Sequence, residues 1–195
     1  MHLAPRLAIR LASAVATAAM FAGPALATEN ISVGHFTQVE LRGGGHVVVK
    51  HGATQSVTLV KGSTQYTSFK IREGRKLVID ACNDHCPNSY DLEIEIVSPD
   101  LDAAAIDGGG EIVAQGSFPG RDRLALAVNG GGDIDMRPIK AAEVDAAVNG
   151  GGDIHLTATR ALNAAVSGGG DISYRGNPQV NEAVQGGGDV QREGS

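Results

Sequence analysis

The sequence contains no tryptophan and only three tyrosines and four phenylalanines among 195 residues. Ligand pockets and sugar platforms usually have aromatic walls, so this composition argues against both kinds of site. Basic residues are also few, because 16 Lys and Arg stand against 22 Asp and Glu for a net charge of −6, and they form no cluster. The chain is therefore not predicted to bind nucleic acid or an anionic membrane surface.

Long apolar runs are lacking as well. The run Leu11–Ala22 has 12 residues, fewer than the roughly 20 that span a bilayer. Two arginines precede it, and a Gly-Pro break leads to a small-residue pattern ending at Ala27. We therefore predict a signal peptide over residues 1–27, cleaved between Ala27 and Thr28, with an uncleaved N-terminal anchor as the alternative. Cleavage leaves 195 − 27 = 168 residues, enough for a single domain over 28–195.

Glycine, by contrast, is abundant, with 27 residues against a usual share of about 7%. Triple glycines begin at positions 108, 130, 150, 168 and 186, at steps of 22, 20, 18 and 18 residues, and an earlier one begins at Gly43. The flanking residues repeat too, as in VDAAVNGGGDIHL at 144–156 and LNAAVSGGGDISY at 162–174. Apolar and polar residues alternate around each triplet, which is the period of a strand with one apolar face. Each unit is therefore interpreted as strand, tight turn, strand.

One such unit cannot bury its apolar face, whereas stacked units bury it as a continuous core. We predict an all-β fold, a single-stranded parallel β-helix (β-solenoid), with regular coils over 103–191 and an irregular β part over 28–102. Three inward columns are expected: Ile106, Val128, Val148, Val166 and Val184; Ile112, Ile134, Ile154, Ile172 and Val190; and Ala104, Leu126, Ala146 and Ala164. Glu182 breaks the third column, which we interpret as the fraying end of the stack.

The triple glycines are interpreted as structural, because tight corners need positive φ and a Cβ would collide with the next coil. Phosphate binding is the alternative, but neither G-x-x-x-x-G-K-[ST] nor G-x-G-x-x-G occurs. The residues before the glycines could form a hydrogen-bonded amide ladder or simply favour the turn. They are Asp107, Asn129, Asn149, Ser167 and Gln185.

An acidic residue follows every regular triplet: Glu111, Asp133, Asp153, Asp171 and Asp189. Stacking would set these carboxylates about 5 Å apart, at a cost on the order of 0.9 kcal/mol per neighbouring pair in water. We expect glycine N–H groups of the corner to offset this repulsion. The alternative is a calcium ion held between coils by these five residues, by comparison with glycine-rich calcium-binding repeats.

Residues 31–100 are strand-like but irregular. Candidate strands cover 35–42, 46–51, 56–61, 68–72, 76–81 and 92–97, and glycine-containing turns separate most of them. We expect them to form the first coils or a hairpin layer that caps one end of the helix, since an open end is an exposed sheet edge.

Only two cysteines occur, Cys82 and Cys86. Exported chains oxidise such pairs, so we predict a disulfide between them. Zinc is the alternative, because His85 lies between them, but no second pair of ligands has suitable spacing.

No catalytic constellation is evident. His35, His46, His51 and His155 are scattered, and no G-x-S-x-G, H-E-x-x-H or catalytic cysteine signature appears. The minimal coils leave nothing to build the groove of a glycan-cleaving β-helix. We therefore predict a protein that is not an enzyme and uses no cofactor.

The order of motifs resembles the bacterial family described as putative auto-transporter adhesin head, GIN domain. The resemblance rests on GHFTQVELRGGGHVVVKHG at 34–52, SVTLV at 56–60, KLVID at 76–80, LEIEIVSPDL at 92–101, the glycine repeats and DISYRGNPQV at 171–180. The segment with Cys82 and Cys86 and the uniform GGGD are less typical of it. The resemblance implies a right-handed β-helix outside the cytoplasm, without established catalytic residues.

Taken together, these features predict an exported, periplasmic or secreted bacterial protein that is a structural or binding module of the envelope. The expected partner is an envelope or surface protein or glycan, in adhesion or protein interaction. A calcium-loaded envelope protein and a glycan-active enzyme are the alternatives.

Overall fold

The computed structural model describes residues 28–82 and 86–194, so the predicted signal peptide over 1–27 and His85 lie outside the described residues. The described chain consists of strands and connecting turns, with no helix. The strands are β1 (Glu29–Asn30), β2 (Gln38–Gly43), β3 (His46–His51), β4 (Ser56–Lys61), β5 (Ser68–Arg72), β6 (Lys76–Asp80), β7 (Glu93–Ser98), β8 (Ala103–Gly108), β9 (Glu111–Gln115), β10 (Arg121–Gly130), β11 (Asp133–Gly150), β12 (Ile154–Gly168), β13 (Ile172–Arg175), β14 (Gln179–Gly186) and β15 (Val190–Arg192). No helix in this part of the chain could cross a membrane.

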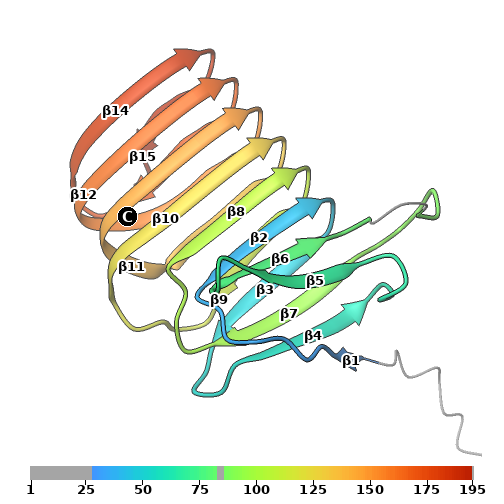
Figure 1. Ribbon diagram of the computed structural model, residues 1–195. Coiled ribbons are helices and arrows are strands. Elements are labelled where there is room, and N and C mark those ends of the chain that lie inside the picture. Colours follow the sequence, from blue (N-terminus) through green and yellow to red (C-terminus); the bar gives the residue numbers. More distant parts are fainter. Residues whose placement is uncertain (1–27, 83–85, 195) are drawn as a thin grey trace, which may run out of the picture.

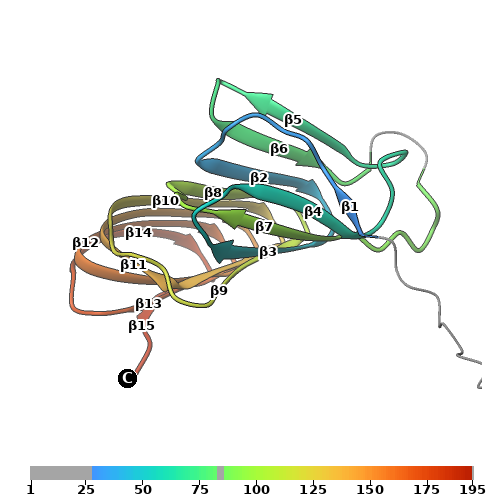
Figure 2. The same ribbon diagram turned by 90° about the horizontal axis from the view of Figure 1, so that it is seen from below.

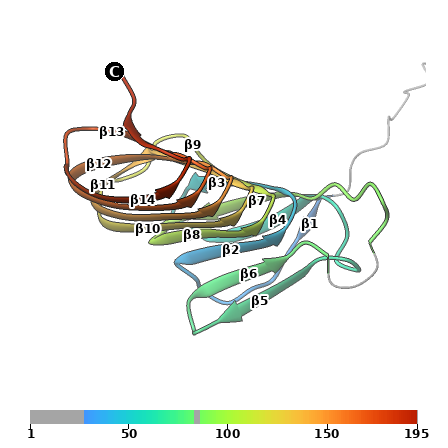
Figure 3. The ribbon, with the colours of Figure 1, turned by 90° about the horizontal axis from the view of Figure 1, so that it is seen from above.

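All strands belong to one strongly curled sheet that folds back on itself as two facing rows (Figure 1). The first row runs β5, β6, β2, β8, β10, β11, β12 and β14. The second runs β1, β4, β7, β3, β9, β11, β12, β13 and β15. The long strands β11 and β12 take part in both rows, and their pairing shifts register where the chain passes from one row to the other. Figure 3 shows the successive turns of chain nested along the stack.

The repeated units stack in register, as their sequences predict. Val128 pairs with Val148, Val148 with Val166, and Val166 with Val184, all in parallel. On the facing row Ile134 pairs with Ile154 and Ile154 with Ile172. These columns point into the space between the rows, where all but the last coil are buried. Full burial of each such side chain contributes about 1.5–3 kcal/mol.

The predicted parallel pairing does not extend over the whole N-terminal part, where β1–β4, β4–β7 and β5–β6 pair antiparallel. Both expectations for this part hold locally, because β2 and β3 pair in parallel with β8 and β9 as a first coil, and β5 and β6 form a hairpin. The sheet is therefore mixed. The physical reason is clearest between β5 and β6, where Glu73 and Gly74 have φ of 54° and 73° and Arg75 N donates to Arg72 O at 3.2 Å. Two successive positive φ angles make a tight reversal, which sends the chain back antiparallel to the strand that it has just left. Figure 2 shows β5 and β6 extending the first row beyond the regular coils.

Candidate functional site

The glycine corners join the two rows and hold each coil close to the next. Gly150 has a φ of +132° and its carbonyl accepts hydrogen bonds from Gly169 N at 2.9 Å and Gly170 N at 3.1 Å in the following coil. Any Cβ on Gly150 would overlap the carbonyl of Gly130. The middle glycine, Gly151, has nothing within 4 Å of the place where a Cβ would lie. The first glycine of the triplet is thus required by conformation, and the middle one faces open space.

The acidic column forms a ladder of hydrogen bonds from coil to coil. Asp153 N donates to Asp133 Oδ1 at 3.1 Å, Asp171 N to Asp153 Oδ1 at 2.8 Å, and Asp189 N to Asp171 Oδ1 at 2.8 Å. The donors are the amides of the aspartates themselves and not the glycine amides that we expected, because the glycine amides already donate to glycine carbonyls. Each bond contributes about 1 kcal/mol, enough to offset the repulsion between neighbouring carboxylates.

The calcium alternative assigned Glu111, Asp133, Asp153, Asp171 and Asp189 to a metal site. Within residues 28–82 and 86–194, no group of three or more His, Cys, Asp or Glu side chains is arranged to hold a metal ion. Glu111 instead contacts His46, with Nδ1 and Oε2 2.8 Å apart. The geometry therefore favours a structural role for this column.

In the column of residues before the glycines, one hydrogen bond between side-chain amides joins two neighbouring coils. Asn149 Nδ2 donates to Asn129 Oδ1 at 3.1 Å. A second step of this kind occurs two columns away, where Asn163 Nδ2 donates to Asp145 Oδ1 at 2.7 Å. Side-chain amides thus support the pairing of β10, β11 and β12 on the solvent side.

The outer surface of the first row carries a shallow groove of about 550 Å³ that crosses six strands, β2, β8, β10, β11, β12 and β14. We name it the alanine groove after the outward-facing column Ala105, Ala127, Ala147, Ala165 and Ala183 that borders it. Gln38, Asp145, Asn163 and Asn181 border its other side. Its length follows from the repeat, because the same short side chain recurs at one place in every coil.

An ion pair closes the N-terminal end of the alanine groove. Lys76 Nζ lies 3.1 Å from Glu40 Oε2, and Arg42 Nε lies 2.6 Å from Glu40 Oε1. Burial by itself would raise the pKa of Glu40, but hydrogen bonds from Arg42 and Lys76 outweigh burial and lower that pKa below its usual value. Glu40 is therefore ionised at neutral pH and holds two cations beside the groove.

A charged cluster on the outer surface of the second row was not evident in the sequence. Glu193 accepts hydrogen bonds from Arg175 Nε at 2.8 Å and Arg137 Nη1 at 3.4 Å, and His155 Nδ1 lies 2.8 Å away. Arg137 also contacts Asp135. The hydrogen bond with His155, together with the charges of Arg137 and Arg175, lowers the pKa of Glu193. Glu193, which directly follows the last strand, thus connects three successive coils.

The other histidines are not brought together. His46 and His51 lie at opposite ends of β3, and the His51 ring packs against Phe118 with centroids 5.9 Å apart. His35 is exposed. No nucleophile and base converge on these rings among the contacts of the described residues.

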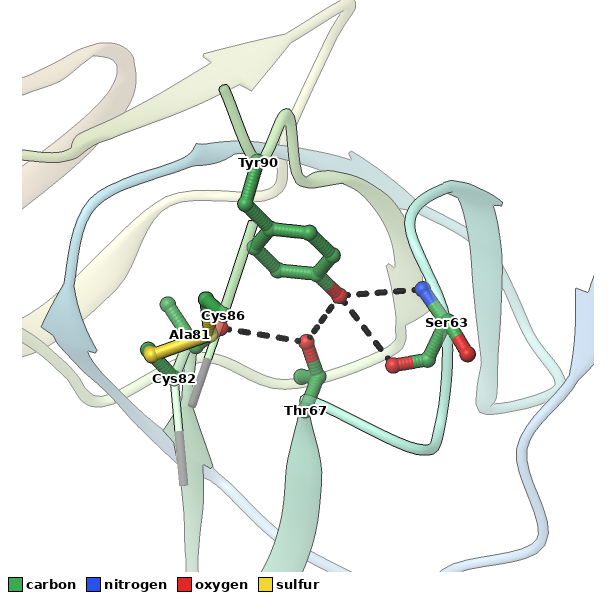
Figure 4. Close-up of a disulfide and its surroundings, with 6 residues drawn as sticks. All are labelled: Ser63, Thr67, Ala81, Cys82, Cys86 and Tyr90. Atoms are coloured by element: carbon green, nitrogen blue, oxygen red, sulfur yellow. Dashed lines mark hydrogen bonds between the residues drawn. A yellow bond between two sulfur atoms is a disulfide. The ribbon is translucent and has the colours of Figure 1, made fainter. Parts of the chain in front are cut away.

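Cys82 and Cys86 are joined as a disulfide, with Cα atoms 5.9 Å apart (Figure 4). Beside it, the Tyr90 hydroxyl accepts a hydrogen bond from Ser63 N at 2.9 Å, donates to Ser63 O at 3.1 Å and lies 2.6 Å from Thr67 Oγ1. Thr67 is almost fully buried and also donates to Ala81 O at 3.4 Å. This network fastens the loop after β4 to the chain on either side of the disulfide.

Comparison with known proteins gives a family and a fold. The chain matches the family model "Putative auto-transporter adhesin, head GIN domain" over residues 35–122 and 104–178. No curated protein matches its sequence. A putative adhesin from Bacteroides fragilis is similar in structure, with a TM-score of 0.56 and 17% identity over 88% of this chain and 98% of that one. A putative adhesin from Parabacteroides distasonis has a TM-score of 0.54 and 16% identity over 86% of this chain and 96% of its own.

Proposed function

Because the chain belongs to the putative auto-transporter adhesin, head GIN domain family, we propose that it is an exported, non-catalytic module of a bacterial envelope that works by adhesion or protein interaction. Residues 1–27 are its signal peptide in this proposal, and residues 28–195 form one domain. The coils over 103–191 wind as a single-stranded right-handed β-helix that gives the module a rigid, extended surface.

The observation that carries the proposal is the alanine groove. It runs over six strands held in one register, and its borders are alanine and amide side chains together with the carboxylate of Asp145. A long, shallow and rigid surface of this kind suits contact with an extended protein or glycan chain, whereas a small substrate needs an enclosed pocket. Three of the charged groups that line it are engaged with other side chains, because Glu40 pairs with Lys76 and Asp145 accepts a hydrogen bond from Asn163.

Binding to envelope material tests this proposal. Tagged protein, purified after export of the full chain, is incubated with washed bacterial envelopes, and the bound fraction is measured against protein concentration. We expect Ala127→Arg and Ala147→Arg to weaken binding at least tenfold, because both side chains face the groove. Gln115→Arg, at an exposed position of β9 on the other row, is the matched control and should bind like the wild type.

Equal binding by all four proteins would contradict a role for the groove. Protease or glycosidase treatment of the envelopes before the assay then identifies the chemical class of the receptor. Processing at Ala27 is checked separately by the mass of the exported protein.

A further inference from the structure

The stack of coils ends in a strand whose outer edge has no partner within the described part of the chain. β14 pairs with β12 alone, and β15, beyond the last corner, pairs with β13 alone. Figure 1 shows β14 as the last strand of its row. The free N–H and C=O groups of such an edge are a template for one more strand.

The inward side chains are uncovered at this same end. Val180 and Val184 are 37% and 40% exposed, and they are the exposed large hydrophobic residues of the described chain. Their partners one coil earlier, Leu162 and Val166, are 0% and 2% exposed. At the opposite end of the row β5 covers β6, and Leu77 of β6 is fully buried. The core is therefore closed at one end and open at the other.

Glu182 occupies the inward position between the two exposed valines. Its partner in β12 is Ala164, and the earlier coils place Ala146, Leu126 and Ala104 in the same column. While the end is open, the carboxylate is solvated. An apolar strand laid on β14 would bury this charge without a partner, which is strongly unfavourable, whereas a strand with a basic side chain there would pair with it.

We propose that the free edge of β14 is a docking site for an extended segment of a partner protein that places Lys or Arg opposite Glu182. Small apolar side chains of that segment would cover Val180 and Val184. Main-chain hydrogen bonds to the edge supply affinity, and Glu182 supplies selectivity by rejecting apolar and acidic segments. A second copy docking through the same strand is disfavoured, since it would bring another Glu182 to the interface. The inference rests on the proposed interaction role and names the chemistry of its partner.

The test uses three peptides with the sequence of residues 161–168 of this chain. One is unchanged, one carries Ala164→Lys and one carries Ala164→Glu. This segment already pairs in parallel with the other edge of β14, with position 164 opposite Glu182. The same pairing on the free edge sets the substituted position opposite Glu182 again.

Binding of each labelled peptide to the full protein is measured by fluorescence anisotropy at low and high salt. We expect the Lys peptide to bind on the order of tenfold more tightly than the Glu peptide at low salt, and salt to narrow the difference. The protein variant Glu182→Lys should reverse the preference, and Asn181→Lys, its outward-facing neighbour, should leave the order unchanged. Thermal melts verify that both variants fold.

Equal binding of the three peptides, binding of none of them, or a preference that Glu182→Lys does not reverse would each overturn the inference. Concentration-dependent self-association of the wild-type protein in sedimentation would overturn it too, because the occupant would then be a second copy. If charge selectivity fails and envelope binding persists, only this inference falls. If envelope binding fails while charge selectivity holds, only the adhesion role falls.

Discussion

Replacing Gly152 with alanine tests the close stacking of the glycine corners. A Cβ at this position would lie 2.9 Å from both Gly132 N and Val128 Cγ1, and closer still to the carbonyl oxygen of Gly132. Real Cβ atoms essentially never come within 3 Å of such neighbours, so the two coils must separate locally. Gly152 has an ordinary φ, which means that the collision alone is being tested.

The cost follows from what that separation breaks. Gly152 N donates to Gly130 O at 3.1 Å, and Asp153 N donates to Asp133 Oδ1 at 3.1 Å. Losing these two bonds costs about 2 kcal/mol and overpacking adds about 1–3 kcal/mol, so we expect a loss of about 3–5 kcal/mol in the free energy of unfolding. For a domain of this size the melting temperature should fall by on the order of 10 °C.

The matched control is Gly151→Ala, one residue away. Nothing lies within 4 Å of its added Cβ and its φ is not left-handed, so it should stay within about 1 kcal/mol of the wild type. Urea and thermal unfolding followed by far-UV circular dichroism measure both variants. Equal destabilisation by the two substitutions, or an unchanged Gly152→Ala, would refute the stacking argument.

Three further predictions concern the charges and the disulfide. Glu193→Gln should lower the stability by up to about 1 kcal/mol at pH 7. Because the pKa of Glu193 is lowered below its usual 4.5, its contribution is present above about pH 4.5 and is lost as the pH falls through the lowered pKa, so urea unfolding of the two proteins should converge in acid. Unreduced exported protein should show no reactive thiol at Cys82 or Cys86 with a thiol reagent, and reduction should cost about 2 kcal/mol in urea unfolding. Calcium should leave the melting temperature equal to that in chelator, since the aspartates already accept amide hydrogen bonds; a rise would instead support the calcium alternative.

The regular coils were predictable because two periods coincide in them. Alternation of apolar and polar residues fixes which side chains point inward, and the recurring triplet fixes which residues stack. Val128, Val148 and Val166 therefore pair as their sequence positions indicate. The sequence also showed that Glu182 is a charged residue in an otherwise apolar column, although the sequence alone does not show that this end of the stack is open.

For the N-terminal part, the sequence predicted the individual strands and a choice between first coils and a hairpin layer, but not the direction of each strand. Six candidate segments coincide with β2 to β7 within three residues at each boundary. Their directions depend on contacts between distant segments, such as Leu59 with Ile94. The N-terminal part has no regular sequence repeat from which such contacts could be predicted. Glu193 was missed for a similar reason, because the cluster joins it to Arg137 across 56 residues of sequence.

The nested coils make the length of this molecule adjustable in whole units. Gly150 and Gly168 are register partners one above the other, so residues 151–168 make one complete circuit. A gene that lost or duplicated this segment would join chain ends that already occupy equivalent places in the cross-section. Whole coils could therefore be gained or lost in evolution, which would lengthen or shorten the alanine groove without changing the side chains that line each coil. The closed N-terminal end and the last strand with Glu182 would have to be kept.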